Sequence, residues 1–222
     1  MSRIPVFKKM DRYKAKNLQA FNTKWPNRYD SSLRMRLWTS QWDRGILTEL
    51  PTDISSLRIL DIGCATGRLL ETLAEAGARH LAGIDLAPKI LDIAQRRLAE
   101  RGIKADLKAA DAEDTLLWAN ESFDVVIMTG ALHHFYRPID ALTEVHRVLC
   151  HRGRLIIIDP WFLPPLRQLF NLGLRFVSPN GDYHFYSPAE AVDMLASQGF
   201  VELRYRRADW NSFIVLGLKD KL

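Results

Sequence analysis

The sequence predicts an α/β protein built on a doubly wound, mostly parallel sheet. From residue 57 onward, short apolar runs typical of buried strands alternate with segments whose apolar residues recur at helical spacing. Near the C-terminus this rhythm changes to two adjacent strand-like runs, which predict a closing antiparallel hairpin. We therefore expect a seven-stranded sheet whose parallel strands are joined by right-handed helical crossovers.

Five apolar runs are the predicted parallel strands, and helical patterns separate most of them. The strands are expected at residues 57–62, 80–85, 103–110, 123–130 and 154–159, and the helices at 68–77, 87–102 and 138–149. The run RLIIID is continuously apolar, as in a strand that is buried on both faces. A further helix over 187–200 is indicated by Ser187 as N-cap and Gly199 at its end, and the hairpin by the runs 201–208 and 211–219.

Length and composition restrict the class of protein. With 222 residues, 47% of them hydrophobic, the chain can form one domain with a full core. No run approaches the roughly 20 apolar residues of a membrane span, and the first residues lack a signal-peptide pattern. The two cysteines, Cys64 and Cys150, suggest neither a disulfide framework nor a zinc site. We expect a soluble, cytoplasmic protein with no metal.

Positive charge is concentrated at the N-terminus. Residues 1–50 contain 11 Lys and Arg against 4 Asp and Glu, a net +7, whereas the remaining 20 basic and 22 acidic residues give −2. We expect 1–50 to be a helical, basic, aromatic-rich cover over a domain formed by 51–222. Such a cover could attract an anionic substrate, a membrane surface or RNA, and it also fits a solvated helix face.

The stretch LDIGCATGRLL joins the first predicted strand to the first helix of the sheet. It places Asp61 just before Gly63 and Gly67. Ligands of such sheets bind beyond the C-terminal ends of the strands, where glycine lets the backbone approach closely and a helix N-terminus offers free N–H groups. A glycine pair alone fits an ordinary turn equally well.

Two more acids end the next two predicted strands. Asp85 ends the second strand, where a carboxylate can accept hydrogen bonds from ribose hydroxyls. Asp111 follows the third strand, where it could accept a hydrogen bond from an adenine amino group. Each acid alone fits a turn or cap. Together with Asp61 they favour a cradle for an adenosyl ligand.

These motifs resemble those of class I S-adenosylmethionine-dependent methyltransferases. LDIGCATG is similar to the family's first motif, commonly DxGxGxG. GIDLAPKILDIAQRR, DAED, FDVVIMTGALHHF and LTEVHRVLCHRGRLIIID are similar to later motifs, so that the resemblance runs continuously over 57–160. It implies a Rossmann-like methyltransferase fold with S-adenosylmethionine as cofactor. Ala65 replaces the family's middle glycine, so we expect no positive φ at that residue.

The resemblance also implies roles for individual residues. It places Asp61 near the cofactor's amino group, Asp85 at the ribose and Asp111 at the adenine. The other residues implied in cofactor binding are Gly63, Cys64, Ala65, Gly67, Leu86, Ala112, Thr129 and Tyr29, the last in an RYD element similar to one that closes over the cofactor in quinone-pathway members. His133 and His134 follow the fourth strand and are candidate general bases.

Residues 160–186 form an insertion after the fifth strand, where the fold often builds a cover for its substrate. Arg167, Asn171 and Arg175 recur every four residues. The remaining apolar face consists of Leu166, Leu169, Phe170, Leu172, Leu174 and Phe176. We expect a helix packed on the core, but the same face fits a lid over an apolar substrate or a patch resting on a membrane.

The predicted function is methyl transfer to a small apolar or aromatic acceptor, such as a quinol-like or lipid molecule. An RNA methyltransferase that uses the basic N-terminal segment is one alternative, although we do not expect nucleic acid as a partner. A NAD-dependent oxidoreductase is a second, but the first turn lacks GxGxxG and Asp111 would have no role. A cofactor-binding module without activity is a third. The oligomeric state cannot be predicted from this sequence.

Overall fold

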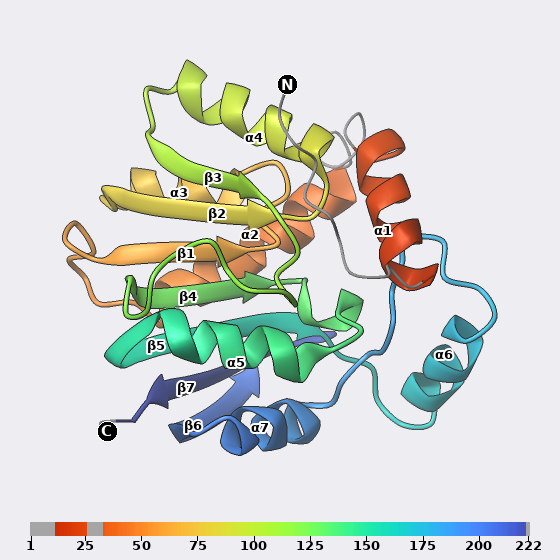
Figure 1. Ribbon diagram of the computed structural model, residues 1–222. Helices are drawn as coiled ribbons and strands as arrows, with labels where there is room; N and C mark the ends of the chain where they lie inside the picture. Colours follow the sequence, from red (N-terminus) through yellow and green to blue (C-terminus); the bar gives the residue numbers. More distant parts are fainter. Residues whose placement is uncertain (1–11, 26–32, 221–222) are drawn as a thin grey trace.

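One seven-stranded sheet organises the molecule. The computed structural model describes residues 12–25 and 33–220, and the side chains of the second range from residue 39 onward. The strand order is β3-β2-β1-β4-β5-β7-β6 (Figure 1). Strands β1 to β5 pair in parallel, whereas β7 pairs antiparallel with both β5 and β6. The predicted doubly wound sheet with its closing hairpin is confirmed.

The strands agree with the predicted runs to within two residues, except at the start of β5. Their bounds are β1 Arg58–Ile62, β2 His80–Asp85, β3 Ala105–Ala109, β4 Phe123–Thr129, β5 Leu149–Pro160, β6 Phe200–Arg207 and β7 Ser212–Lys219. β5 begins at Leu149 because that residue pairs with Phe123. The register then shifts before the pair Val125 and Arg154, where the predicted strand starts.

Helices cover both faces of the sheet. They are α1 Arg12–Thr23, α2 Leu33–Leu47, α3 Arg68–Glu75, α4 Pro88–Glu100, α5 Pro138–Val148, α6 Leu166–Leu174 and α7 Pro188–Ser197, with a 3₁₀ turn at Leu132–His134. Side chains of α2, α3 and α4 share one hydrophobic cluster with alternate residues of the strands. Side chains of α5 and α7 share the opposite cluster with the intervening residues. The sheet is therefore the middle of three layers.

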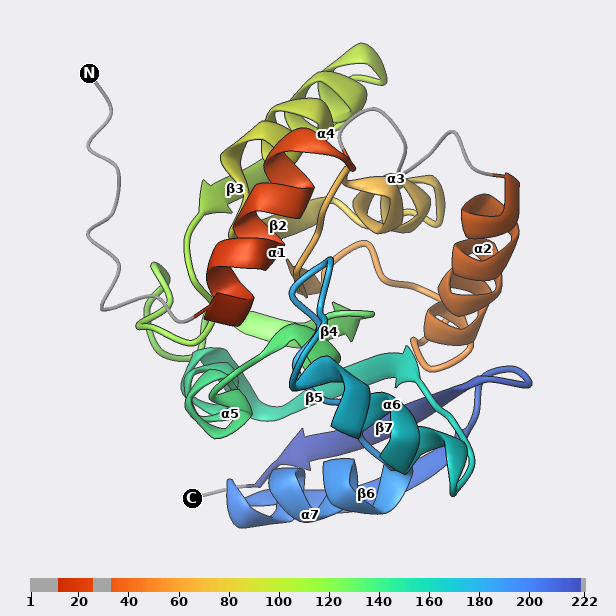
Figure 2. The same cartoon turned by 90° about the vertical axis from the view of Figure 1, so that its right-hand side faces the viewer.

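The topology places a binding crevice beyond β1 and β4. From β1 the chain moves outward through β2 to β3 and then returns to β4 on the other side of β1. Loops that leave neighbouring strands at such a reversal diverge, which opens a crevice at their C-terminal ends. Helices α1 and α6 lie on this side of the sheet (Figure 2).

The two N-terminal helices contribute differently to the structure. Trp42 and Ile46 of α2 are buried in the same cluster as α3 and α4. Helix α1 instead approaches α4 and the 3₁₀ turn after β4. The division into a cover of residues 1–50 and a domain of 51–222 stays a prediction. Among the described helices, none has both the length and the apolar character that a bilayer crossing requires.

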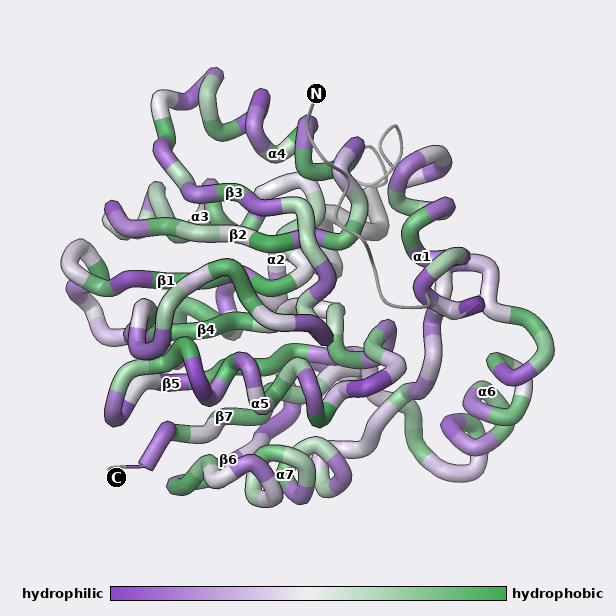
Figure 3. Tube along the Cα trace, in the orientation of Figure 1, coloured by the Kyte–Doolittle hydropathy of each residue, from purple (hydrophilic) through white to green (hydrophobic). Residues whose placement is uncertain are grey.

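The insertion helix differs from its prediction. α6 was expected to pack its apolar face on the core, but it buries none of its residues. It stands apart from the sheet and its covering helices, with hydrophobic residues along its tube (Figure 3). The expectation of a core helix is wrong, because periodicity shows that a helix has two faces and not which of them turns inward.

Helix α7 begins with the predicted N-cap. Ser187 Oγ accepts a hydrogen bond from the Glu190 N–H, and the Glu190 carboxylate accepts one from the Ser187 N–H at 2.6 Å. This capping box satisfies two backbone donors that the helix itself leaves unpaired. We expect Ser187→Ala to lower the free energy of unfolding by about 1 kcal/mol. Urea denaturation measures the change.

Ser197, at the other end of α7, provides the matched control. Its exposed hydroxyl donates to the Met194 carbonyl and accepts from the Gln198 side chain, and it caps no backbone N–H group among the described residues. Ser197→Ala should leave stability within about 0.5 kcal/mol of the parent. Equal losses for the two variants would contradict the capping role of Ser187.

Candidate functional site

The loop after β1 has the backbone of a ligand cradle. Gly63 has φ +74°, and a Cβ there would lie 2.9 Å from the Cβ of Ala131. Ala65 has φ +45°, so the expectation that this residue avoids positive φ is wrong. A left-handed conformation costs alanine roughly 1–2 kcal/mol, and it persists only where neighbouring contacts enforce it.

The Asp85 carboxylate is the contact that holds the loop. Its Oδ2 accepts a hydrogen bond from the Ala65 N–H at 3.0 Å, and its Oδ1 accepts one from the Ala87 N–H at 2.9 Å. The side chain thus ties the loop after β1 to the start of α4. Burial raises the pKa of Asp85 to about 6. Each carboxylate oxygen keeps a further lone pair for a ligand donor.

Asp61 and Thr129 both line a small cavity beside the loop after β1. Asp61 is 2% exposed, and burial and the neighbouring Asp85 raise its pKa to about 7. Thr129 Oγ1 is buried without a hydrogen-bond partner among the described residues. Arg68 lines this cavity too and forms an ion pair with Asp43. A carboxylate and a guanidinium on one cavity suit a ligand that carries both an amino and a carboxyl group.

The far end of the crevice is closed by a buried ion-pair cluster that sequence reasoning missed. Lys14 of α1 lies 2.6 Å from Asp111 Oδ2 and 2.5 Å from Glu113 Oε2. Asp111 Oδ1 accepts the Glu113 N–H at 2.9 Å. Hydrogen bonds to both carboxylates raise the pKa of Lys14 despite its burial. Asp111 therefore holds α1 against the crevice as well as facing it.

Most predicted cofactor-binding residues meet in this crevice. The cavity at the strand ends, here called the first cavity, is lined by Gly63, Ala65, Asp85, Leu86, Asp111, Ala112 and Thr129 from the prediction, and also by Lys14, Asn17, Phe21, Ile84, Ala110, Glu113, Gly130, Ala131, His134 and Phe135. The adjoining smaller cavity is lined by Asp61 and Cys64. Gly67 lies at the start of α3, where a Cβ would be 3.0 Å from that of Ala94. Tyr29 lies outside the described residues.

A second cavity adjoins the first and is strongly aromatic. It is lined by Phe21, Trp25, Thr39, Trp42, Gly130, His133, His134, Pro160, Phe162, Asn180, Asp182 and Phe185. Phe21, Gly130 and His134 line both cavities. The junction therefore lies at the end of β4, the place where a group could pass from one bound molecule to another.

Gly130 fits this junction because it lacks a side chain. It has φ +62°, and a Cβ there would lie 2.8 Å from Trp42 Cζ3. The Trp42 ring is fixed by its Nε1, which donates to Ser212 Oγ at 3.0 Å and to Asp209 Oδ2 at 3.1 Å. Any larger residue at position 130 would displace the Trp42 ring, which lines the aromatic cavity and the small cavity beside Asp61.

His133 is the better candidate base of the histidine pair. Its Nδ1 lies 3.0 Å from Oδ1 of Asp159, which is fully buried. Burial opposes the charged ring, but Asp159 and Asp182 outweigh it and raise the pKa of His133. The carboxylate on Nδ1 orients the ring so that Nε2 faces Asp182, which also lines the aromatic cavity.

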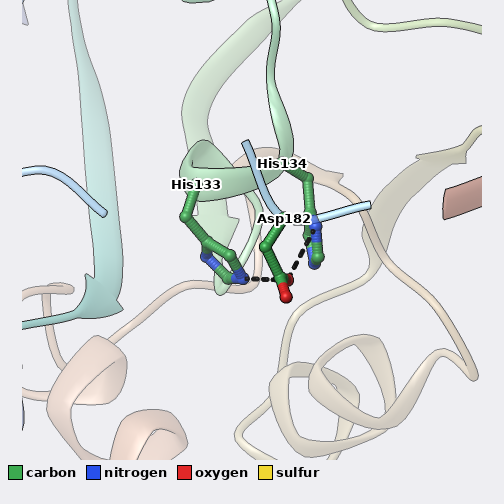
Figure 4. Close-up of side chains that lie close together, drawn as sticks. All are labelled: His133, His134 and Asp182. Atoms are coloured by element: carbon green, nitrogen blue, oxygen red, sulfur yellow. Dashed lines mark ion pairs between the residues drawn. The ribbon is translucent and has the colours of Figure 1, made fainter. Parts of the chain in front are cut away.

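His134 has a different electrostatic environment. Burial and the neighbouring His133 hold its pKa well below the usual range. Asp182 lies between the two rings, with its Oδ1 3.6 Å from His133 Nε2 and 3.4 Å from His134 Nδ1 (Figure 4). The three possible ligand atoms lie within 4.8 Å of one another, so the group could also hold a metal ion. The expectation of no metal stays a prediction.

The residues that sequence reasoning missed come from distant parts of the chain. Lys14 and Phe21 lie on α1, and Asp182 and Phe185 lie in the insertion. No local pattern marks them. Asp159 was also missed, but the sequence could have indicated it, because it is an acid at the end of a continuously apolar strand.

The chain is similar to known methyltransferases in sequence. Residues 60–157 match the family described as "Methyltransferase domain". The chain is 29% identical over 153 residues to a ubiquinone biosynthesis O-methyltransferase of Xanthomonas euvesicatoria, covering 66% of this chain and 64% of that protein. It is 30% identical over 166 residues to one from Cereibacter sphaeroides, covering 72% and 66%. The similarity thus spans about two thirds or less of these relatives.

Solved structures show the same fold. Magnesium protoporphyrin IX methyltransferase from Synechocystis, with bound SAH, superposes with a TM-score of 0.73 at 20% identity, over 93% of this chain and 100% of that one. A SAM-dependent methyltransferase from Aquifex aeolicus gives 0.65 at 18% identity, over 95% and 100%. The solved structures show the fold, and the sequence matches show that the chain belongs to the class I S-adenosylmethionine-dependent methyltransferases.

Proposed function

We propose that this protein transfers a methyl group from S-adenosylmethionine to a hydroxyl of a small, apolar aromatic molecule. The observation that carries the proposal is the junction of two unlike cavities at Gly130 and His134. One is lined by strand-end acids, and the other by aromatic rings beside a carboxylate-backed histidine. The curated relatives named as ubiquinone biosynthesis O-methyltransferases support transfer to oxygen.

The first cavity and the smaller cavity beside it together have the groups that the cofactor requires. Asp85 would accept hydrogen bonds from the ribose, and Asp61 and Arg68 would hold the amino and carboxyl groups. Thr129 Oγ1, buried without a partner among the described residues, would gain one. When bound, S-adenosylmethionine supplies a methyl group on a cationic sulfur, which is an activated donor. The nicotinamide alternative does not agree with the family assignment.

The second cavity has the groups that a phenolic acceptor requires. Phe162 and Phe185 pack edge to face, with ring centroids 5.0 Å apart, and Phe185 stacks on the His133 ring at 5.4 Å. Such walls bind a flat apolar ring and exclude water from it. His133 Nε2 would accept the acceptor's hydroxyl proton, while Asp159 stabilises the resulting imidazolium. The protein's own contribution is thus orientation and removal of one proton.

Asp85→Asn tests the cofactor cavity. The amide can accept one of the two backbone N–H bonds but presents a donor to the other, so the loop should lose its cradle conformation. The parent should be stabilised by about 2.7 kcal/mol at S-adenosylhomocysteine concentrations 100 times the Kd, and the variant should show no such shift in thermal unfolding. Asp92→Asn, on the exposed side of α4, should behave as the parent. An undiminished shift in the Asp85 variant would contradict the proposal.

Cofactor affinity should depend on pH. Asp61 and Asp85, with pKa values of about 7 and about 6, are partly protonated in the free protein near neutrality. A bound ammonium group and ribose hydroxyls favour the ionised carboxylates, so binding releases protons. Affinity for S-adenosylhomocysteine should fall about tenfold or more between about pH 8 and about pH 5. Calorimetric titration checks this, with Asp61→Asn expected to flatten the profile; a pH-independent affinity in the parent would refute it.

His133→Gln tests the base. Turnover with alkyl-substituted phenols and catechols should fall about 100-fold, while S-adenosylhomocysteine binding is retained. The parent's kcat/KM should fall with decreasing pH below the raised pKa of His133. His146 lies on α5 and packs against Phe200. His146→Gln is the matched control and should leave turnover unchanged.

Two further results would count against His133 as the base. A chelator that abolishes parent turnover would favour a metal held by His133, His134 and Asp182. A pH profile that is the same in the His133 variant and the parent would show that another group titrates. RNA methylation stays an alternative prediction, and turnover on RNA without turnover on any phenol would favour it.

A further inference from the structure

Helix α6 is amphipathic, but its polar side faces the protein. Arg167 Nη1 lies 2.7 Å from Glu190 Oε2 at the start of α7. Asn171 Nδ2 donates to the Phe185 carbonyl at 3.1 Å, and the Phe185 N–H donates back to Asn171 Oδ1 at 2.8 Å. These bonds fix the rotation of the helix about its axis. The usual orientation of a surface helix, apolar side inward, is thereby reversed.

The other side of α6 exposes an apolar patch. Its members on the helix and just after it are Leu166, Leu169, Phe176 and Val177, all more than one third exposed. Leu169 is 61% and Phe176 77% exposed. Phe170 instead packs on Phe162 and Phe185 of the aromatic cavity, and Leu172 lines a further cavity beside Tyr13. The four patch residues line none of these cavities, so the patch is not the inner surface of a lid. Exposed apolar clusters of this kind mark an external binding partner.

Basic side chains border the patch where α6 meets α1, whereas the nearby acid Glu190 is paired with Arg167 on the inner side of α6. Residues 160–181 contain no Asp or Glu, and neither do residues 12–25. Arg12 of α1 donates to the Arg175 carbonyl at the end of α6, which joins the two helices at this edge. Arg12 and Arg175 are exposed at this edge, and Lys16 is exposed one turn further along α1. An apolar face bordered by cations matches a bilayer surface, whose acyl chains lie beneath anionic headgroups.

We propose that the α6 patch docks this protein on the surface of an anionic lipid bilayer. The apolar residues would enter the headgroup–acyl boundary, and Arg12, Lys16 and Arg175 would contact lipid phosphates. The same insertion supplies Phe162 and Phe185 to the aromatic cavity, so docking would place that cavity beside the membrane. The docking does not depend on methyl transfer, and it can be measured without activity.

Vesicle flotation of the full chain tests the proposal. The protein should float with vesicles of equal parts phosphatidylcholine and phosphatidylglycerol, and only weakly with phosphatidylcholine alone. Leu169→Gln combined with Phe176→Gln should weaken binding about tenfold or more. Arg12→Gln combined with Lys16→Gln should weaken binding to the anionic vesicles and reduce its sensitivity to salt.

Matched controls separate docking from general surface effects. Leu117, 59% exposed outside the insertion, is the control for Leu169, and Arg96 on α4 is the control for Lys16. Leu117→Gln and Arg96→Gln should bind vesicles as the parent does. All variants should keep the S-adenosylhomocysteine thermal shift, so a failure of docking is distinguishable from a failure of the proposed activity.

Three outcomes would overturn the proposal. The first is a parent protein that floats with neither vesicle. The second is a Leu169/Phe176 variant that floats like the parent. The third is analytical ultracentrifugation showing a dimer that the Leu169/Phe176 variant dissociates, with no vesicle binding by the parent. That last result would assign the patch to contact between two copies of the chain.

Discussion

The structure around the site depends on one buried carboxylate, that of Asp85. Its two hydrogen bonds to backbone N–H groups tie the loop after β1 to the start of α4 across the end of β2. They support Ala65 in a conformation that alanine avoids. Without this bridge, the backbone after β1 would be free to relax and the crevice at the strand reversal would lose its floor. Asp85 therefore shapes the binding loop even without a bound ligand.

Buried charged groups also join separate segments elsewhere around the crevice. Asp111 and Glu113 clamp Lys14 and so fix α1 as the roof of the first cavity. Asp159 orients His133, whose carbonyl accepts the Tyr183 and His184 N–H groups and so anchors the insertion. Buried ionic groups are costly unless paired. The first pairing joins α1 to the loop after β3, and the second joins β5 to the turn after β4, so both pairs help to shape the cavities.

The central fold and half of the site followed from local sequence patterns. A few neighbouring residues were enough to predict the strands, the Ser187 cap and the acids Asp61, Asp85 and Asp111. Lys14 and Asp182 do not, because they reach the site only through tertiary packing. The positive φ of Ala65 was missed because it is imposed by a partner 20 residues away. The reversed orientation of α6 was missed for the same reason, since Glu190 and Phe185 determine it.

A crystal structure with bound S-adenosylhomocysteine tests the account most directly. We predict ribose hydroxyls within hydrogen-bond distance of Asp85, adenine at Ala112 under α1, and the sulfur open to the cavity of His133 and Phe185. An adenosyl group bound elsewhere, or a sulfur turned away from the aromatic cavity, would contradict the assignment of the two cavities to donor and acceptor.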